Sequence, residues 1–571
     1  MKDPLRHARG EYYTPRWLAD LVLDEAGYDG APGRRLLDPS CGLGVFLEAA
    51  IARVKDWGAA HGESPPETAR RILSEIQGFE RNPQSAARAR QAYLVAMGEP
   101  GEPFAVDRVP IQAADVLLDP PVAGPYDLLA GNPPWVRWDH LPEDYRAATL
   151  PLWKRYGLFS LRGFASVLGG GKKDLCMLFT YAAADRFLRP GGMLAFLVSQ
   201  EVFKAKGAGE GFRRFRLGEV GEELGVTAAH DFANFQPFQG AANKSAAILL
   251  VKGQATRYPV PYHVWTRDRS GRLARETLQA HPVGTATGPW RTAAAGDAAG
   301  FLHGENAYRP VLGANANPYG VFWLEVLRAM PEGLLEVRNL PELGKSDISP
   351  VTAVVEPDLV YPALRGADIQ RWCAVPRVHV LLVQDPVTRT GYPEDAFRAR
   401  WPRTWDYISR FREVLISRAL YRRYHRRAGR PFYSQFNIGP ALMSPFKVVW
   451  KRMSNDLCAA VVSSWDGPLG SKMVAPLETT SFIGVETARE AHYLCAFLNS
   501  QLARSYVKSL SAAGRGFGAP SAVATLSIPK FDPRNAAHLA LAEASPACQA
   551  RPGADAGLDG LVKAALSRLL L

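Results

Sequence analysis

The sequence predicts an α/β fold, with a doubly wound sheet in the first part of the chain and a mixed α+β domain after it. Across roughly the first 250 residues, short apolar segments alternate with segments of helical periodicity, which is the pattern of strands joined by helices. The chain has 571 residues, more than one domain usually contains. The alternation fades beyond about residue 255. The pattern therefore predicts a first α/β domain and at least one further domain.

The expected elements of the first domain follow one another in a regular order. We expect strands at residues 34–38, 75–80, 109–113, 126–130, 193–198 and 245–251, and helices at 45–57, 83–97 and 175–188. The run 193–198 is apolar throughout, as in strands that are covered on both faces. In an open sheet of this kind, ligands bind at the carboxyl ends of the strands. Residues that follow the strands are therefore the candidates for a site.

The remaining chain differs in composition. Residues 258–262 alternate tyrosine or valine with proline, and 293–300 are rich in alanine and glycine, which favours linker or irregular structure. Beyond about residue 335 the segments are shorter, aromatic and rich in arginine, and a last helical stretch covers 558–571. We therefore expect four parts: a first domain over 1–255, a connecting region over 256–334, a second domain over 335–535 and a helical tail over 536–571.

Composition sets further limits on the class of protein. A hydrophobic share of 47% with 22% charged residues is ordinary for a globular protein. No apolar run has membrane-spanning length, and the N-terminus lacks an apolar signal region. The 6 cysteines form no Cys-x-x-Cys pair, so neither a zinc site nor a disulfide framework is indicated, and a reducing cytoplasm is expected. The net charge of +12 suits a polyanionic partner, or reflects a genome rich in GC.

The run Gly131-Asn132-Pro133-Pro134-Trp135 directly follows an expected strand. Two successive prolines fix φ and remove two backbone donors, so carbonyl oxygens project without a competing N–H. The side-chain oxygen of Asn132 and the carbonyl of Pro133 could both accept from one planar NH2 group, and Trp135 could stack on the ring that carries it. The alternative is a proline-stiffened loop with a packed tryptophan. Asn132, Pro133, Pro134 and Trp135 are thus the candidate catalytic residues.

The expected first strand ends in Leu37-Asp38-Pro39-Ser40-Cys41-Gly42-Leu43-Gly44. The two glycines allow a ligand to approach the backbone closely. Leu47 stands where a phosphate-binding fingerprint would have its third glycine, so G-x-G-x-x-G is absent. The carboxylate of Asp38 disfavours a pyrophosphate and suits a cationic ligand.

Two further acids follow the next two expected strands. Glu80 ends the second and is placed to bind ribose hydroxyls. Asp115 follows the third, where a carboxylate can accept from an adenine amino group. A cation, a ribose and an adenine together describe S-adenosyl-L-methionine. Each acid taken alone is more often a solvated loop residue, but three at successive strand ends favour this cofactor.

In this order of motifs the sequence resembles the amino-group DNA methyltransferases, specifically the gamma-class, TaqI-like N6-adenine enzymes. Their G-x-x-Y/F-T-P segment, which holds the methionine part of the cofactor, is matched by Gly10-Glu11-Tyr12-Tyr13-Thr14-Pro15. Leu43 departs from the small polar residue usual in the family. The resemblance implies a Rossmann-like, S-adenosylmethionine-dependent methyltransferase domain with a C-terminal DNA-recognition domain. The cofactor-binding residues it implies are Tyr13, Thr14, Pro15, Asp38, Pro39, Ser40, Cys41, Gly42, Gly44, Glu80, Asp115 and Asn132.

Further matches extend the resemblance over about residues 10 to 252. Lys173-Asp174-Leu175 with the apolar helix after it, and 188–192, resemble the family's central helix and fifth strand. Phe235-Gln236-Pro237-Phe238-Gln239 resembles its aromatic loop. We expect Phe238 to stack on the target base together with Trp135, although a core phenylalanine is an equal alternative. Cys41 is given no nucleophilic role.

A dense arginine cluster marks the expected second domain, which resembles the family's target-recognition domain. The cluster covers residues 398–430, with few acids and with interleaved tryptophans and tyrosines. Phosphate contacts would give affinity, and some arginines would read guanine edges. The alternative is a solvated helix face. The expected DNA-binding residues are Arg398, Arg400, Arg410, Arg422, Arg423, Arg426, Arg427, Lys447 and Lys451.

The resemblance implies methyl transfer to adenine N6 of a base flipped out of double-stranded DNA, in restriction-modification or antiviral defence. The same Asn-Pro-Pro-Trp site would serve cytosine N4, an RNA base or a protein glutamine, and a catalytically silent DNA-binding subunit is a further alternative. No metal and no membrane are expected. We expect a restriction nuclease or other defence subunits to be separate proteins, and the chain to lie in the bacterial cytoplasm, at the nucleoid when on DNA.

Overall fold

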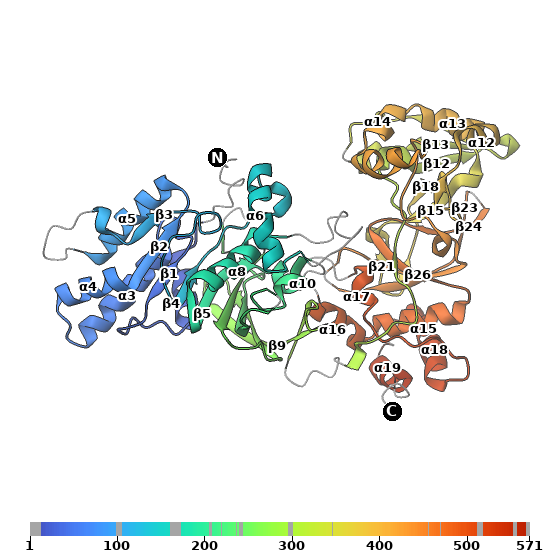
Figure 1. Cartoon of the computed structure of the whole chain (residues 1–571). Helices are drawn as coiled ribbons and strands as arrows, with labels where there is room; N and C mark the ends of the chain where they lie inside the picture. Colours follow the sequence, from blue (N-terminus) through green and yellow to red (C-terminus); the bar gives the residue numbers. More distant parts are fainter. Residues whose placement is uncertain are drawn as a thin grey trace. The chain divides into compact units, whose positions relative to one another are not determined.

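The computed structural model divides the chain into two compact units, Met1–Asp297 and Ala298–Leu571 (Figure 1). The structure describes residues 13–98, 106–159, 173–204, 208–218, 220–235, 237–238, 244–294, 301–344, 346–454, 456–468, 470–510, 518–551, 555 and 557–566. Each unit has its own hydrophobic core.

The first unit is built on one 10-stranded sheet, in the order β10-β9-β8-β6-β7-β5-β4-β1-β2-β3. The strands β1 to β5 pair in parallel, whereas β7 is antiparallel to both β5 and β6. The strand order reverses between β1 and β4, which is where open α/β sheets bind ligands. The strands are β1 Leu36–Asp38, β2 Ile76–Glu80, β3 Ile111–Ala113, β4 Tyr126–Gly131, β5 Leu188–Ser199, β6 Leu224–Asp231, β7 Ser245–Lys252, β8 Val260–Arg267, β9 Leu273–Pro282 and β10 Trp290–Ala293.

Helices connect these strands largely where the sequence predicts them. The expected helix 83–97 is α5, and the expected helices 45–57 and 175–188 are α3 and α8. The sequence did not predict α2, α4, α6, α9 or α10. The helix α4 opens with two prolines behind a capping box formed by Ser64 and Glu67, and proline is tolerated in the first turn of a helix. The helices are α2 Arg16–Glu25, α3 Val45–Ala60, α4 Pro65–Glu75, α5 Pro83–Met97, α6 Glu143–Arg155, α8 Leu175–Phe187, α9 Glu201–Lys204 and α10 Ala208–Phe212.

The expected connecting region over 256–334 is wrong. Its first part supplies β8, β9 and β10, which extend the sheet of the first unit, and the boundary between the units falls at Asp297 and Ala298. The prolines of 258–262 stand at the start of β8, where a strand tolerates them. The side chains of β9 are exposed or half-buried, except that of Ala280, which is buried. The polar sequence of β9 therefore lacks the apolar alternation by which a strand is recognised.

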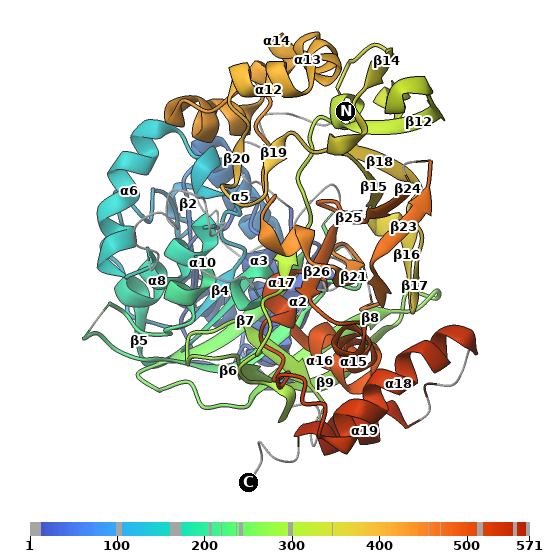
Figure 2. The ribbon, with the colours of Figure 1, turned by 90° about the vertical axis from the view of Figure 1, so that its right-hand side faces the viewer.

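The second unit combines helices with two larger sheets, in the orders β11-β26-β21-β22 and β14-β13-β12-β18-β15-β25. In Figures 1 and 2, α12, α13 and α14 gather beside the larger of these sheets, and α15, α16, α18 and α19 gather at the other end of the unit. Its longer strands are β12 Trp323–Ala329, β13 Leu335–Asn339, β14 Thr352–Val355, β15 Val360–Leu364, β18 Val378–Leu381, β21 Phe446–Lys451, β22 Ala459–Val462 and β26 Thr480–Val485, with β11 Val311–Leu312 and β25 Ala475–Pro476 completing the sheets. Two-stranded pairs are β16 Ile369–Gln370 with β17 Cys373–Ala374, β19 Gln384–Asp385 with β20 Thr390–Gly391, and β23 Ser464–Gly467 with β24 Gly470–Met473. The helices are α11 Tyr319–Phe322, α12 Glu394–Arg400, α13 Pro402–Ser409, α14 Arg412–Ser417, α15 Ala488–Asn499, α16 Gln501–Leu510, α17 Pro520–Val523, α18 Ala536–Ala550 and α19 Leu558–Leu566.

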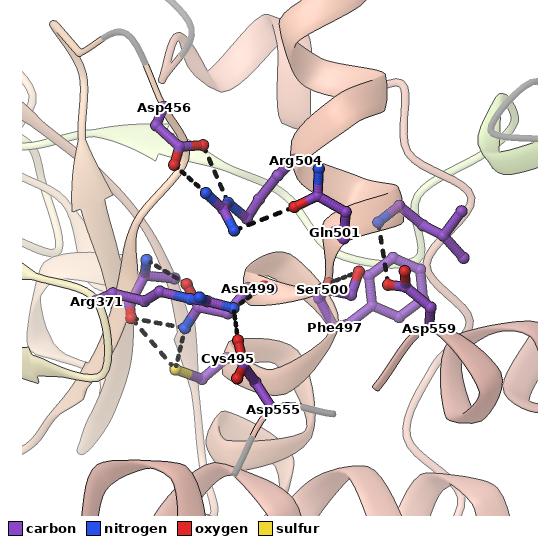
Figure 3. A network of polar contacts seen from close by, with 12 residues as sticks. Arg371, Asp456, Cys495, Phe497, Asn499, Ser500, Gln501, Arg504, Asp555 and Asp559 are labelled. Atoms are coloured by element: carbon purple, nitrogen blue, oxygen red, sulfur yellow. Dashed lines mark hydrogen bonds and ion pairs between the residues drawn. The ribbon is translucent and has the colours of Figure 1, made fainter. Parts of the chain in front are cut away.

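The last two helices belong to the core of the second unit and are no separate tail. Residues of α18 and α19 share a buried cluster with α15. A polar network fixes the same region (Figure 3): Arg371 donates to the carbonyl of Asn499 at 2.8 Å and pairs with Asp555 at 2.8 Å. The side chain of Asn499 bonds both the N–H and the carbonyl of Ala459, each at 2.9 Å. Asp555, between α18 and α19, is thus connected through Arg371 and Asn499 to Ala459 on β22.

Candidate active site

Asp38 ends β1 at the point where the strand order reverses. Its side chain is buried with 1% exposed, and Oδ1 accepts a hydrogen bond from the Ser40 N–H at 3.0 Å. A side chain at Gly131, on the neighbouring strand β4, would collide with this carboxylate, so glycine is required there. The pKa of Asp38 is raised from 3.8 to about 8, chiefly by burial; the hydrogen bond from Ser40 lowers the pKa and the charge of Glu80 raises it. A cation beside Asp38 would favour its ionised form.

The loop after β1 is held by Glu80 at the end of β2. Glu80 Oε2 accepts from the Gly42 N–H at 2.9 Å, and Oε1 accepts from the Asn82 N–H at 2.8 Å. Gly42 and Gly44 have φ of 55° and 96°, in the left-handed region that favours glycine. Cys41 is buried in this loop, where burial and the nearby carboxylates raise the pKa of its thiol well above the usual value. Burial therefore favours the protonated thiol over the thiolate.

The loop after β4 meets both the N-terminal segment and the loop after β1. Asn132 Nδ2 donates to Thr14 Oγ1 at 3.2 Å. Ser40 Oγ donates to the carbonyl of Asn132 at 3.3 Å. Three motifs that lie far apart in the sequence therefore converge on Asn132. Thr14 is half-buried and is followed by Pro15, the N-cap of α2, whereas Tyr13 is exposed. Gly10, Glu11 and Tyr12 of the same motif lie outside the described residues.

The two aromatic residues expected at the base site lie against each other. Trp135 and Phe238 have ring centroids 5.2 Å apart with an interplanar angle of 72°, an edge-to-face contact. Both side chains are buried, with 4% and 2% exposed. Trp135 Nε1 also donates to the carbonyl of Leu197 on β5, at 3.4 Å. The two side chains are therefore in contact. Phe238 is buried in the core, as in the alternative interpretation of this residue.

Asp115 follows β3 and has a partner that sequence analysis missed. Its carboxylate accepts from the hydroxyl of Tyr145, on α6, at 3.2 Å, and pairs with Arg81 Nε at 3.2 Å. The signals available for α6 were Pro142 before it and the acids Glu143 and Asp144 in its first turn. No local signal connects position 145 with position 115, because their contact depends on the tertiary fold.

The segment after Trp135 pairs with the start of α8. The N–H of Leu175 donates to the carbonyl of Val136 at 2.8 Å, and the N–H of Trp138 donates to that of Lys173, also at 2.8 Å. Asp174 caps α8 by accepting from the Cys176 N–H at 3.1 Å, and burial raises its pKa to about 6. The matched Lys173-Asp174-Leu175 segment therefore pairs with the residues that directly follow Trp135.

In the second unit, the arginine cluster forms an exposed basic surface on a buried aromatic base. Trp401, Tyr407 and Tyr421 are buried, so the interleaved aromatic residues anchor the segment to the core. A π-helical turn, η8 (Tyr421–His425), turns its arginines outward. Arg418 differs: it is half-buried and donates to three backbone carbonyls, a structural role. The exposed members are Arg398, Arg400, Arg403, Arg410, Arg412, Arg422, Arg423, Arg426 and Arg427.

The expected DNA contact of Lys447 is wrong. Lys447 lies on β21 between β22 and β26, has 0% of its surface exposed, and donates to the Ser444 carbonyl at 2.7 Å. Burial lowers the pKa of its ammonium from 10.5 to about 7. Because lysine is rarely buried in proteins, the sequence predicted that Lys447 lies at the surface. Lys451, at the end of the same strand, is half-buried.

The strand-end residues of the first unit fit S-adenosylmethionine chemically. A buried carboxylate at Asp38 suits a cation, Glu80 and Asp115 carry carboxylate oxygens that donors of the protein now engage, and the glycine loop allows close approach. Across the described ranges, no group of three or more His, Cys, Asp or Glu side chains is placed to hold a metal ion. No helix in the described part of the chain is long and apolar enough to span a membrane.

Comparison with known proteins places the chain near restriction-modification methyltransferases. No protein-family model matches it. The Type II methyltransferase M.BstVI of Geobacillus stearothermophilus is 35% identical over 282 residues, 47% of this chain and 46% of that protein. The Type II methyltransferase M.XhoI of Xanthomonas vasicola is 27% identical over 255 residues, 43% and 42% of the two chains. The chain thus spans about half the length of the curated relatives that it matches.

Two solved structures share the fold. The Type IIL restriction-modification enzyme MmeI, solved in complex with DNA, matches with a TM-score of 0.56 at 13% identity, over 97% of this chain and 73% of MmeI. The Type ISP restriction-modification enzyme LlaGI, solved as a nuclease-deletion mutant with a DNA substrate mimic, matches with a TM-score of 0.51 at 12% identity, over 95% and 47%. The chain therefore has an α/β fold of the kind found in restriction-modification enzymes.

Proposed function

We propose that this protein is an S-adenosylmethionine-dependent DNA methyltransferase that modifies the N6 amino group of adenine. One observation carries the proposal: Asn132, in the loop after β4, is hydrogen-bonded to Thr14 and Ser40 at the switch point of the sheet, where Gly131 lies directly against Asp38. These contacts support a role for Asn132 and Pro133 as acceptors for an NH2 group, next to a carboxylate that suits a sulfonium cation. The similarity to Type II methyltransferases supports the same class of reaction.

The residues of the loop act by positioning and by electrostatics. When bound, S-adenosylmethionine supplies an electrophilic methyl group on a positively charged sulfur. Asn132 Oδ1 and the Pro133 carbonyl accept the two N–H bonds of the target amino group. These hydrogen bonds favour a pyramidal nitrogen and direct its lone pair toward the methyl group. The reaction needs no covalent enzyme intermediate.

The aromatic pair serves the flipped base. N6 of adenine is inaccessible inside a duplex, so the base leaves the stack before it reacts. Trp135 and Phe238 lie edge to face at 5.2 Å. A base that enters between them separates the rings and gains a stacking surface on Trp135.

The exposed arginines of the second unit suit the DNA backbone, because guanidinium groups bind phosphates bidentately. MmeI, which shares the fold, was solved in complex with DNA. We propose that a restriction nuclease or other defence subunits act as separate partners, in restriction-modification or antiviral defence in the cytoplasm.

Nucleoside digestion and mass spectrometry of DNA treated with the purified protein and S-adenosylmethionine test the proposal. We expect N6-methyladenine, and about a thousandfold loss or more with Asn132→Ala, because an amide that positions the reacting group is lost. N4-methylcytosine would refute the adenine assignment. Full activity of Asn132→Ala would refute the mechanism.

A further inference from the structure

The carboxylate of Asp115 is surrounded by donors from the protein. Oδ1 accepts from the N–H groups of Leu117 at 2.9 Å and Leu118 at 3.1 Å. Oδ2 accepts from the Tyr145 hydroxyl at 3.2 Å and lies 3.2 Å from Arg81 Nε. A carboxylate offers about four acceptor positions, and these donors occupy them. A further donor can bind well only where one of the present donors leaves.

The donors differ in how firmly they are held. The two N–H groups are fixed by the backbone turn after β3. Tyr145 is 8% exposed and packs in the core of the first unit. The Arg81 side chain is 65% exposed, and ion pairs at such positions contribute little. Its guanidinium also lies over the Tyr145 ring, 4.3 Å from the centroid, so it can leave the carboxylate and keep the ring contact. Of these donors, Arg81 is therefore the one whose departure from the Asp115 carboxylate requires the least free energy.

We propose that Arg81 yields its place on Asp115 to the adenine amino group of S-adenosylmethionine, while the hydroxyl of Tyr145 holds the carboxylate in position. This inference rests on the proposed function, because it takes that cofactor as given. Tyr145 is then a positioning residue, and Arg81 competes with the cofactor for one acceptor.

The arrangement also predicts how the site selects its purine. An amino group donates to Asp115, whereas a carbonyl oxygen at the same position would face its negative charge. Arg81 has the opposite preference, since a guanidinium donates to a carbonyl oxygen and competes with an amino group. The two residues therefore affect the choice between adenine and hypoxanthine in opposite directions.

Calorimetric binding of two product analogues to the full chain tests the role of Tyr145. S-Adenosylhomocysteine carries the amino group, and S-inosylhomocysteine carries a carbonyl oxygen in its place. We expect Tyr145→Phe to reduce the affinity for the adenosyl compound at least about tenfold, because a hydrogen bond to a charged acceptor is lost. The affinity for the inosyl compound should change little. Tyr156→Phe is the matched control: it removes a hydroxyl bonded to Asp185 at 2.8 Å, just beyond the other end of α6, and both affinities should stay as in the wild type.

Arg81→Ala tests the competition in the same assay. We expect the adenosyl compound to bind about threefold more tightly, as for loss of an exposed ion pair, and the inosyl compound to bind more weakly. Arg88→Ala, an exposed arginine on α5, controls for the change in net charge. Weaker adenosyl binding in Arg81→Ala, or an unchanged adenosyl-to-inosyl ratio in Tyr145→Phe, would overturn the inference. If the wild type binds neither compound, the proposed cofactor itself is wrong.

Discussion

At the scale of single residues, the chemistry of Asp38 depends on its burial. Its folded pKa of about 8 lies above its ordinary value of 3.8, so folding favours the protonated carboxyl. The stability that Asp38 contributes is fully present below pH 3.8 and is lost as the pH rises to about 8. A cationic ligand reverses the preference, because it stabilises the carboxylate.

Binding of S-adenosylmethionine should therefore release a proton near neutral pH. We expect affinity to increase from pH 6 toward about 8, the pKa of Asp38, and then to level off. Calorimetry in buffers with different ionisation enthalpies measures the proton released. Asp38→Asn should bind more weakly and lose this pH dependence. An unchanged pH profile in that variant would show that Asp38 does not meet the cation.

The hydroxyl of Thr14 should act through Asn132, whose Nδ2 it accepts at 3.2 Å. We expect Thr14→Val to slow single-turnover methylation by about fivefold, the effect of one lost neutral hydrogen bond. Thr14→Ser keeps the hydroxyl and should retain most of the rate. A loss in Thr14→Ser as large as that in Thr14→Val would contradict a role for the hydroxyl.

At the scale of elements, the sequence predicts strands and helices well where the sheet is buried and regular. The runs at 126–130, 193–198 and 245–251 correspond to β4, β5 and β7, because strands inside a covered sheet are apolar almost throughout. β8, β9 and β10 escaped prediction for different reasons: prolines stand at the start of β8, the side chains of β9 are mostly polar and exposed or half-buried, and β10 has only 4 residues.

The site could be predicted in part for the same reason. Asp38, Glu80 and Asn132 stand directly at strand ends, so the strand pattern locates them. The contact between Tyr145 and Asp115, and that between Thr14 and Asn132, join residues remote in the sequence. Lys447 was misplaced because lysine usually lies at the surface, whereas here it is fully buried on β21 and burial lowers the pKa of its ammonium.

The π-helical turn and the residues after it should bind DNA phosphates. Arg422 and Arg426 are both exposed there, and replacing both by alanine should reduce the slope of log affinity against log salt by about 1.8, or 0.9 for each phosphate that an arginine no longer neutralises. Filter-binding or anisotropy titrations on duplex DNA at several salt concentrations give the slope. Lys447→Met is the control and should leave it unchanged, because Lys447 is fully buried. An unchanged slope in the arginine variant would show that this turn is not part of the DNA interface.

At the scale of the whole molecule, the two units have separate cores. We expect two calorimetric unfolding transitions, and we expect S-adenosylmethionine to raise the midpoint temperature of only one of them. At about 100 times the Kd, the ligand should stabilise that transition by about 2.7 kcal/mol. Asp38→Asn should reduce the shift. A ligand-induced shift of both transitions would contradict a cofactor site confined to the first unit.

The central claim concerns the base that the Asn132 loop modifies. Single-molecule sequencing of DNA from cells that express the protein tests it most directly, since it reports base, position and site together. The account predicts N6-methyladenine at one recurrent sequence, absent from cells that express Asn132→Ala. N4-methylcytosine at that sequence, or N6-methyladenine that persists in the Asn132→Ala cells, would contradict it.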